Sequence, residues 1–167
     1  ARNQHAEGVT FKLKDDPRVR ALQTRLKLDP QDAAARLELA AFYESYRFFD
    51  AALDQYRESF RLFRSEQAVM GFARSARALR RAPEAIPLLE TFLKESPTAS
   101  AWNQLGLLHD EMGDLAAGEI ALREAVARDA KSDRLYNNLG YNLLLQNKTE
   151  AAESEFRKAL ELNSKSA

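Results

Sequence analysis

Apolar residues recur at helical spacing through most of the chain, and short polar turns separate the segments that carry them. Asp16 followed by Pro17 is a typical helix start, which predicts a helix over 17–28 that ends before Asp29-Pro30. Paired helices are predicted beyond it, with first helices at 33–46, 66–80, 100–112 and 133–146 and second helices at 50–63, 83–95, 115–129 and 149–162. Because only a few residues join the members of a pair, they run antiparallel.

Particular residues mark the ends of the first helices and a distortion in one second helix. Gly113 follows a first helix, as a glycine just beyond a helix end does, and Arg47, Arg80 or Arg81, and Asn147 occupy the equivalent positions. Pro87 removes an early backbone hydrogen bond from the helix at 83–95, so a distorted first turn is expected there.

Residues 1–16 differ from the rest and are predicted to form an N-terminal tail. Val9, Phe11 and Leu13 alternate with polar residues. A short strand is one interpretation, and an extended tail that packs its apolar residues locally or not at all is the other.

Residues 99–166 repeat themselves with a constant offset of 34 positions. The aligned residues are Trp102 with Tyr136, Leu105 with Leu139, Gly106 with Gly140, Gly118 with Ala152, Leu122 with Phe156 and Ala125 with Ala159. A period of this size is typical of stacked helical repeats. Repeats are therefore predicted at 33–65, 66–98, 99–132 and 133–166, with 17–32 as a half repeat or a cap.

The repeated positions resemble the tetratricopeptide repeat (TPR) family, whose pattern is W-x2-L-G-x2-Y, then A-x3-F, then P. The matching residues include Trp102-x2-Leu105-Gly106, Tyr136-x2-Leu139-Gly140 with Ala152-x3-Phe156, Leu39-Ala40-x2-Tyr43 with Ala52-x3-Tyr56, and Phe72-Ala73 with Pro97. The resemblance implies an all-α fold, a right-handed superhelical solenoid of antiparallel helix pairs over 17–167, with four repeats plus an N-terminal helix. Arg18 stands where a small residue is expected, which favours a cap.

The composition is typical of a folded protein with no net charge. Apolar residues make up 45% and charged residues 30%, and the basic and acidic side chains number 25 each. General attraction to nucleic acid is therefore not expected, and no apolar run approaches the roughly 20 residues that span a bilayer. The sequence begins with Ala1 rather than Met, which leaves two locations open: the cytoplasm, or the periplasm and outer membrane after loss of a leader or lipid anchor.

Catalytic chemistry is not predicted. The chain lacks cysteine and has two histidines, of which His109 fills a packing position that is usually Tyr in the family. No Gly-rich phosphate loop, nucleophile elbow or metal-ligand spacing occurs. We therefore expect no enzyme activity, metal or cofactor.

TPR proteins generally hold a peptide on a concave face that is lined mainly by their first helices. The resemblance places the lining one position after the packing stripe, at i, i+4 and i+7. The predicted peptide-binding groove consists of Met70, Arg74, Arg77, Asn103, Leu107, Asn137, Asn138 and Tyr141. Its further lining comprises Leu37, Ala41, Glu44, Gln104, Asp110 and Leu144.

Two features of this lining admit two interpretations each. Arg74 and Arg77 either capture an acidic side chain or peptide C-terminus or pair within the protein. The amides of Asn103 and Asn138 and their neighbours either bind a peptide backbone or join successive repeats. Outside the groove, Tyr46, Phe48 and Phe63 are surplus aromatic residues, meaning that the packing positions of the repeat do not account for them. They either cover the N-terminal tail or form a patch that contacts a partner.

The predicted function is a non-catalytic scaffold that binds a protein or peptide partner, which is acidic if the arginines capture it. Around Asn137–Tyr141 the chain also resembles bacterial TPR lipoproteins of pilus or secretion assembly, including the Tad/Flp type. That resemblance implies a role in assembling a bacterial envelope complex. The alternatives are an accessory or regulatory fragment of a larger enzyme or secretion protein, and self-association through exposed solenoid ends.

Overall fold

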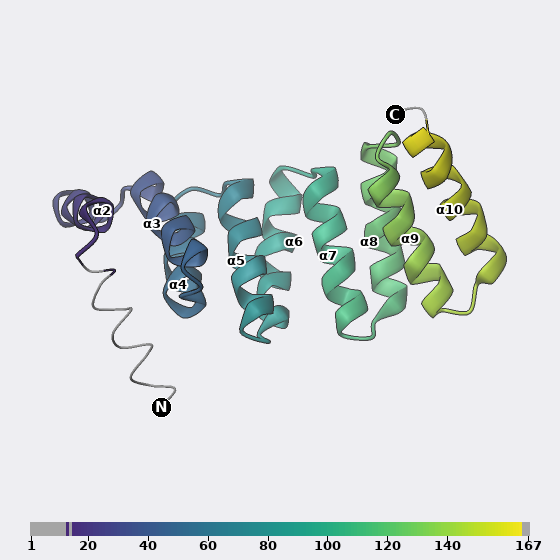
Figure 1. The fold of residues 1–167 in the computed structure, drawn as a ribbon, viewed down its shortest axis with the longest axis horizontal. Coiled ribbons are helices and arrows are strands. Elements are labelled where there is room, and N and C mark those ends of the chain that lie inside the picture. The colour runs from purple at the N-terminus through teal and green to yellow at the C-terminus, as the bar shows by residue number, and fades with distance from the viewer. Residues whose placement is uncertain (1–12, 14, 165–167) are drawn as a thin grey trace. The chain divides into compact units, whose positions relative to one another are not determined.

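The computed structural model describes residues 13 and 15–164, and every regular element in this part of the chain is helical. Helix α2 (Pro17–Leu28) precedes the helix pairs (Figure 1). These are α3 (Ala33–Ser45) with α4 (Phe49–Leu62), α5 (Glu66–Ala78) with η1 (Ala82–Ala85) and α6 (Ile86–Glu95), α7 (Ala99–Glu111) with α8 (Leu115–Arg128), and α9 (Asp133–Leu145) with α10 (Thr149–Ser164). The all-α class predicted from the sequence is thereby confirmed.

Local signals explain where the helices begin and end. The Asp16 carboxylate accepts a hydrogen bond from the Arg18 backbone N–H at 2.8 Å, so Asp16 caps α2 as predicted. Two residues beyond the end of each first helix lies a residue with positive φ, namely Arg47, Arg80, Gly113 and Asn147. The predicted distortion near Pro87 takes the form of the 3₁₀ turn η1, which replaces the first turn of a regular helix.

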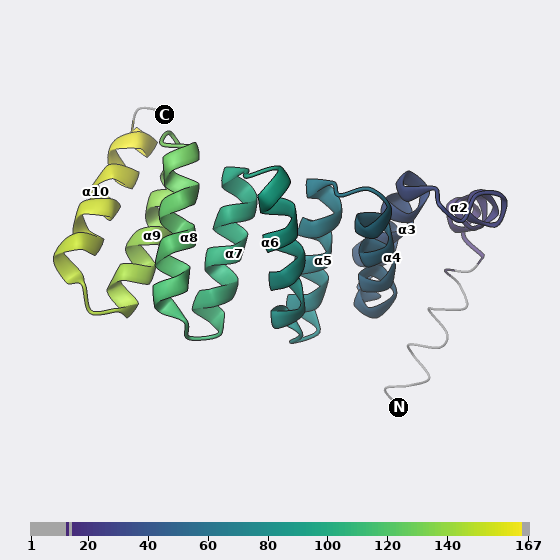
Figure 2. The ribbon, with the colours of Figure 1, turned by 180° about the vertical axis from the view of Figure 1, so that it is seen from behind.

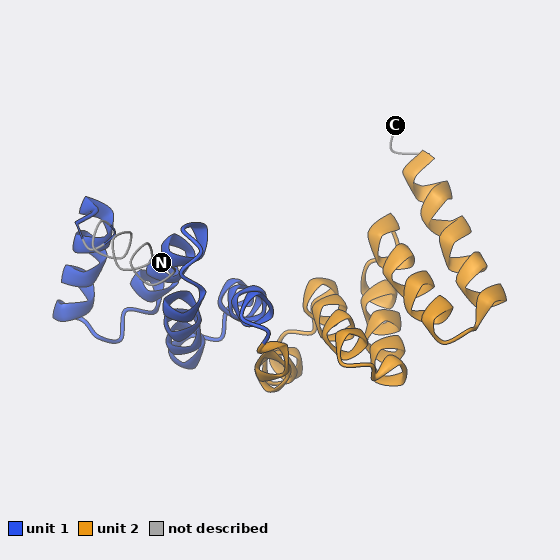
Figure 3. Cartoon of the chain, turned by 60° about the horizontal axis from the view of Figure 1, so that its bottom comes forward, with its two compact units in different colours: residues 1–80 blue, residues 81–167 orange. Residues whose placement is uncertain are grey.

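The chain forms two compact units, residues 1–80 and residues 81–167 (Figure 3). The boundary falls between the two helices of the repeat predicted at 66–98. The single solenoid over 17–167 and the tail over 1–16 stay predictions. Val9 and Phe11, of the hypothetical strand, lie outside the described residues, whereas Leu13 is helical and buried.

The core of unit 1 joins α2, α3 and α4. Leu13 packs in a cluster with Val19, Leu22 and the α3 residues Ala35 and Leu39, and Phe48 packs against this cluster. The other surplus aromatic residues, Tyr46 and Phe63, remain exposed. On the far side of α4 the Tyr56 ring lies so close to Gly71 of α5 that any Cβ there would overlap it. This contact fixes how closely α4 and α5 approach.

The core of unit 2 alternates first and second helices, with α9 between α8 and α10 in both views (Figures 1 and 2). A cluster of buried residues joins the three helices: Leu122, Leu139, Leu143 and Ala152, with Val126 and Phe156 packed against it. A Cβ on Gly106 would lie 2.6 Å from Leu122 Cγ and 3.1 Å from the Gly118 carbonyl oxygen. The absence of a side chain at Gly106 is therefore required by distance at this helix crossing.

We expect Gly106→Ala to destabilise the fold more than Gly140→Ala does. Both substitutions gain roughly 1 kcal/mol of helix propensity. At position 106 the new methyl group meets the fully buried Leu122 and a backbone oxygen, whereas at position 140 it meets the half-buried Phe156 ring, which has room to turn. Overpacking costs about 1–3 kcal/mol where neighbours are fixed. Urea unfolding followed by circular dichroism measures the difference, and equal stabilities would contradict this account.

Candidate functional site

The residues of the predicted groove lie on three first helices. In unit 1, α5 carries Met70, which is half-buried, and Arg74 and Arg77, which are exposed. In unit 2, Asn103 is buried and Leu107 half-buried on α7. On α9, Asn138 is half-buried, and Asn137 and Tyr141 are exposed.

In unit 1, Arg74 is paired with a carboxylate of the same chain. Its Nε and Nη2 atoms donate to Glu44 Oε1 and Oε2 at 2.7 and 3.0 Å, and the Tyr56 hydroxyl donates to Glu44 Oε2 at 2.5 Å. This bidentate pair joins α3 to α5 across the buried ring of Tyr56. Arg77 also interacts with other residues of the chain. Pairing within the protein was one of the two interpretations of these arginines.

Protonation in this cluster follows from its burial and its partners. Burial raises the pKa of Glu44, but the hydrogen bonds from Arg74 and Tyr56 outweigh it, so the net shift is downward. Burial and the adjacent carboxylate raise the pKa of the Tyr56 hydroxyl. At neutral pH the cluster therefore holds an ionised Glu44, a charged Arg74 and a neutral Tyr56 that acts as donor.

In unit 2, the amides join successive repeats. Asn138 Nδ2 on α9 donates to Asn103 Oδ1 on α7 at 2.7 Å. The fully buried Asn142 donates from Nδ2 to Asp110 Oδ1 at 2.5 Å and to the Leu115 carbonyl at 3.0 Å. Sequence reasoning missed Asn142, although a polar residue at a packing position that holds Leu108 one repeat earlier was the available signal.

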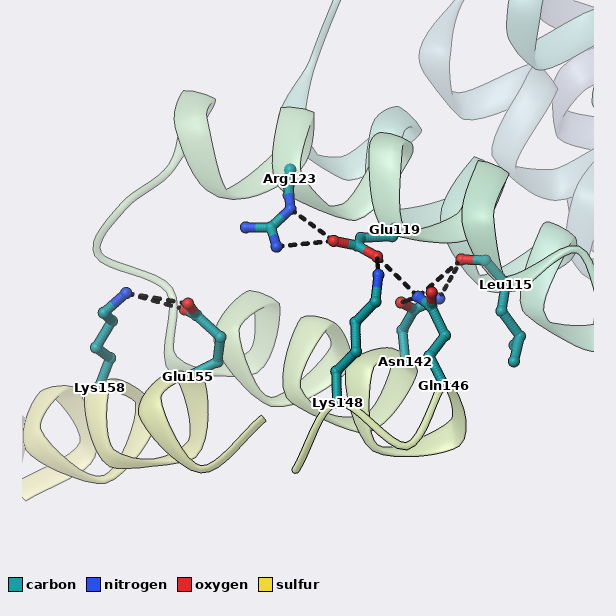
Figure 4. Close-up of polar contacts among 8 residues, drawn as sticks. All are labelled: Leu115, Glu119, Arg123, Asn142, Gln146, Lys148, Glu155 and Lys158. Atoms are coloured by element: carbon teal, nitrogen blue, oxygen red, sulfur yellow. Dashed lines mark hydrogen bonds and ion pairs between the residues drawn. The ribbon is translucent and has the colours of Figure 1, made fainter. Parts of the chain in front are cut away.

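A second carboxylate, Glu119 on α8, extends this network (Figure 4). Its oxygens accept hydrogen bonds from Lys148 Nζ at 2.6 Å, Gln146 Nε2 at 2.8 Å and Arg123 Nη2 at 2.8 Å. The Lys148 hydrogen bond is the main cause that lowers the pKa of Glu119 to about 2. Burial opposes it as the next largest effect, and the hydrogen bonds from Arg123 and Gln146 lower the pKa further. Asp110 shifts the other way, because burial raises its pKa more than the Asn142 hydrogen bond lowers it.

One face of α9 combines exposed apolar side chains with an unpaired cation. Tyr141, Leu144 and Leu145 are 58%, 45% and 44% exposed and lie at i, i+3 and i+4. Toward the start of α9, the Asn137 side chain is exposed, and no hydrogen bond or ion pair ties the Arg134 guanidinium to the described residues. We call Arg134, Asn137, Tyr141, Leu144 and Leu145 the α9 face. It can bury apolar groups and bind a backbone amide or carboxylate.

Neither a metal-binding cluster nor a membrane-spanning helix is found in the part of the chain that the structure describes. No group of three or more His, Asp or Glu side chains there could hold a metal ion. Among the described helices, none has the length and hydropathy to cross a bilayer.

The opposite pKa shifts of Glu119 and Asp110 predict opposite effects of neutralising them. The pKa of Glu119 is lowered on folding, so its stabilisation is present above the unfolded value of roughly 4 and is lost as pH falls toward about 2. The pKa of Asp110 is raised, so the stability gained from its protonation is complete below roughly pH 4 and is lost as pH rises through the folded pKa. Ionised Asp110 therefore costs stability at neutral pH.

We expect Glu119→Gln to lower the free energy of unfolding at neutral pH by about 1 kcal/mol. Asp110→Asn keeps an acceptor for Asn142, so it should leave that free energy unchanged or raise it by up to about 1 kcal/mol. Urea unfolding at neutral pH and below pH 4 measures both variants. The reverse order of stabilities at neutral pH would show that the assigned charge states are wrong.

Comparisons with known proteins place these features in a family. The sequence model of a family described as Tetratricopeptide repeat matches residues 70–133 and 103–167. The structure is similar to that of MamA, with a TM-score of 0.81 and 23% identity over 89% of this chain and 88% of that one. For MamA of Desulfovibrio magneticus RS-1 the TM-score is 0.77, with 18% identity over 98% and 95% of the two chains. YrrB, described as a TPR protein with an unusual peptide-binding site, gives a TM-score of 0.74 and 18% identity over 92% and 81%.

A sequence search of curated proteins finds no match. At these identities the solved structures show the fold alone, and they confirm the TPR array predicted from the repeat pattern. They do not confirm the resemblance to pilus-assembly lipoproteins, which stays a prediction. Since the family model covers more than half of the chain, this protein belongs to the tetratricopeptide repeat family and is a scaffold for protein–protein interaction.

Proposed function

We propose that this scaffold is non-catalytic and binds a segment of another protein on the faces of its first helices, with the α9 face as the main contact. The supporting observation is the exposure of three large apolar side chains, Tyr141, Leu144 and Leu145, on one face of a single helix. Exposed apolar residues scattered singly are ordinary, but a contiguous group is typical of an interaction site.

We assign the predicted groove residues two different roles, according to whether their amides are hydrogen-bonded within the protein or exposed. Asn103 and Asn138 bond to each other, so they hold α7 and α9 together and present a fixed surface. Asn137 and Tyr141 are exposed beside them and are the residues of this group that we expect to contact the partner. The description of YrrB as a TPR protein with a peptide-binding site supports a peptide segment as the bound species.

The partner is proposed to carry a carboxylate. Arg134 offers an exposed guanidinium without a partner among residues 15–164, at one end of the apolar group. Arg74 can take part if the partner's carboxylate replaces or joins Glu44 at its half-exposed guanidinium. The resemblance around Asn137–Tyr141 supports a partner in a bacterial envelope complex.

We expect Tyr141→Ser combined with Leu144→Ser to abolish capture of the main partner in a quantitative pulldown with mass spectrometry. Burial of exposed apolar surface contributes about 25 cal/mol per Å², so losing two such side chains removes several kcal/mol of binding free energy. Ile120→Ser is the matched control, because Ile120 is 65% exposed on the second helix α8. The proposal would be contradicted if the Ile120→Ser variant lost the partner while the double variant still captured it, because the partner would then bind outside the α9 face.

A second pair of variants tests the acidic character of the partner. We expect Arg74→Ala with Arg77→Ala to weaken binding of the identified partner by about 1–3 kcal/mol for each charged hydrogen bond lost. Glu44→Gln leaves both guanidinium groups in place and should not weaken binding. Isothermal titration calorimetry measures the affinities, and circular dichroism checks helicity. Equal losses in the two variants would assign these arginines a structural role only.

A further inference from the structure

We propose that the surface formed by α9 and α10 docks an amphipathic helix of the partner protein, in the position that the first helix of a further repeat would take. This proposal rests on the function proposed above, because α9 belongs to both surfaces, and it names the kind of segment that is bound. In unit 2, α9 packs against α7 and α8, whereas the main neighbour of α10 among the described helices is α9 (Figures 1 and 2). The contacts of α9 with α7 and α8 therefore show what the surface of α9 and α10 can bind.

The carboxylate of α8 that receives the end of α9 has an exposed counterpart on α10. Glu119 accepts hydrogen bonds from Gln146 at the end of α9 and from Lys148 in the turn that follows (Figure 4). The repeat places Glu153 at the equivalent position of α10, where its side chain is 60% exposed, against 15% for Glu119. Glu153 is paired with an arginine four residues later in its own helix, but so is Glu119, which still accepts both donors. A helix that ends in an amide and a lysine is therefore complementary to Glu153.

An apolar position of α10 is also left open. Val126 of α8 packs against the buried cluster to which α9 contributes Leu139 and Leu143. Its equivalent on α10 is Leu160, which is 68% exposed, and Phe156 one turn earlier is half-buried. A helix with leucines spaced as in α9 would cover both side chains.

The first helix α9 contributes a polar position to the same surface. Asn103 of α7 accepts a hydrogen bond through its side-chain oxygen from Asn138 of the next first helix. Asn137 is equivalent to Asn103 in the last repeat, and its side chain is exposed. An amide of the docked helix at the position of Asn138 can therefore donate to Asn137.

At one position the docked helix has to differ from α9. A Cβ on Gly118 would lie 2.0 Å from Asp110 Oδ1 and 2.9 Å from Asn142 Nδ2, so this pair of polar groups requires a glycine. The last repeat has Ala152 in place of Gly118 and Leu144 in place of Asp110. An amide at the position of Asn142 would therefore meet a methyl group and find no acceptor on Leu144.

The preceding pair of helices in unit 2 shows which residue fits an alanine there. In α6 and α7, the residues equivalent to Gly118 and Asn142 are Ala85 and Leu108, and both are fully buried. The docked helix is therefore expected to carry leucine at this position. Its stripe of leucines then meets Leu144 and Leu160, and its end meets Glu153.

A peptide with the sequence of residues 132–148 and the change Asn142→Leu is a probe that meets these requirements. It keeps the amides, leucines and lysine at the native spacing, namely Asn138, Leu139, Leu143, Gln146 and Lys148. Because isolated helices of this length are marginal in water, a side-chain staple placed away from these residues is required. Fluorescence anisotropy of the labelled peptide, titrated with the full chain, measures the affinity.

We expect saturable binding that Glu153→Lys weakens by at least about tenfold, as loss of a charged hydrogen bond does. A peptide that also carries Lys148→Glu should bind the Glu153→Lys variant better than it binds the unmodified chain. Leu160→Ser should weaken binding as well, because an apolar side chain is lost from the contact. Glu58→Lys is the matched control, since Glu58 is likewise paired with an arginine of its own second helix, in unit 1.

Two results with the peptide would overturn the proposal. Absence of binding, or binding that Glu153→Lys and Leu160→Ser leave unchanged in chains of normal helicity, would show that α9 and α10 do not accept a further first helix. A dimer in analytical ultracentrifugation that Leu160→Ser dissociates would make the occupant a second copy of the chain instead of a partner protein.

Capture of the main partner distinguishes failure of this proposal from failure of the proposed function. Leu160→Ser should lose the partner, as the Tyr141→Ser, Leu144→Ser variant does. Retention of the partner by Leu160→Ser, with its loss from the double variant, would overturn the docked helix and leave the proposed function standing. Retention by both variants would overturn the proposed function, and the docked helix with it.

Discussion

The packing of neighbouring helices depends on close contacts that leave no room for a side chain. Gly106 lies against Leu122 and Gly140 against Phe156, while Gly71 lies against the ring of Tyr56 in unit 1. Because a large residue fills the space that glycine leaves, the contact sets how closely the two helices approach. One side of the first helices α5, α7 and α9 is committed to such a contact, and recognition has to use what remains.

Part of the remaining surface of a first helix forms hydrogen bonds with the neighbouring repeat. Glu44 and Asp110 hold the same position in alternate repeats, and each accepts hydrogen bonds from the next first helix, from Arg74 in one case and Asn142 in the other. The partner decides the direction of the pKa shift: the pKa of Glu44 is lowered because the hydrogen bonds from Arg74 and Tyr56 outweigh burial, whereas burial raises the pKa of Asp110, which has an amide as partner. At the same position α9 carries Leu144, which is exposed. Among the described residues no first helix follows α9, so the Leu144 side chain has no such neighbour.

The helices and their ends could be predicted from the sequence because their causes are local. Asp16-Pro17 starts α2, Gly113 and Asn147 end first helices with positive φ, and Pro87 distorts the start of its helix. The state of Arg74 could not be decided, because its pairing with Glu44 joins residues 30 positions apart. The role of Asn142 depends in the same way on Asp110, which lies 32 positions away, so the amide at a packing position signals a buried polar group but not its partner. Periodicity locates helices, whereas side-chain pairing depends on distances that periodicity does not contain.

The central claim is that a partner protein contacts the first-helix surface at α9. Site-specific photocrosslinking tests it directly, with benzoylphenylalanine placed at Tyr141 in one variant and at Ile120 in another, since both side chains are exposed in unit 2. The account predicts that a single partner crosslinks at position 141 and not at position 120. A partner that crosslinks at position 120 and leaves position 141 unmodified would contradict it.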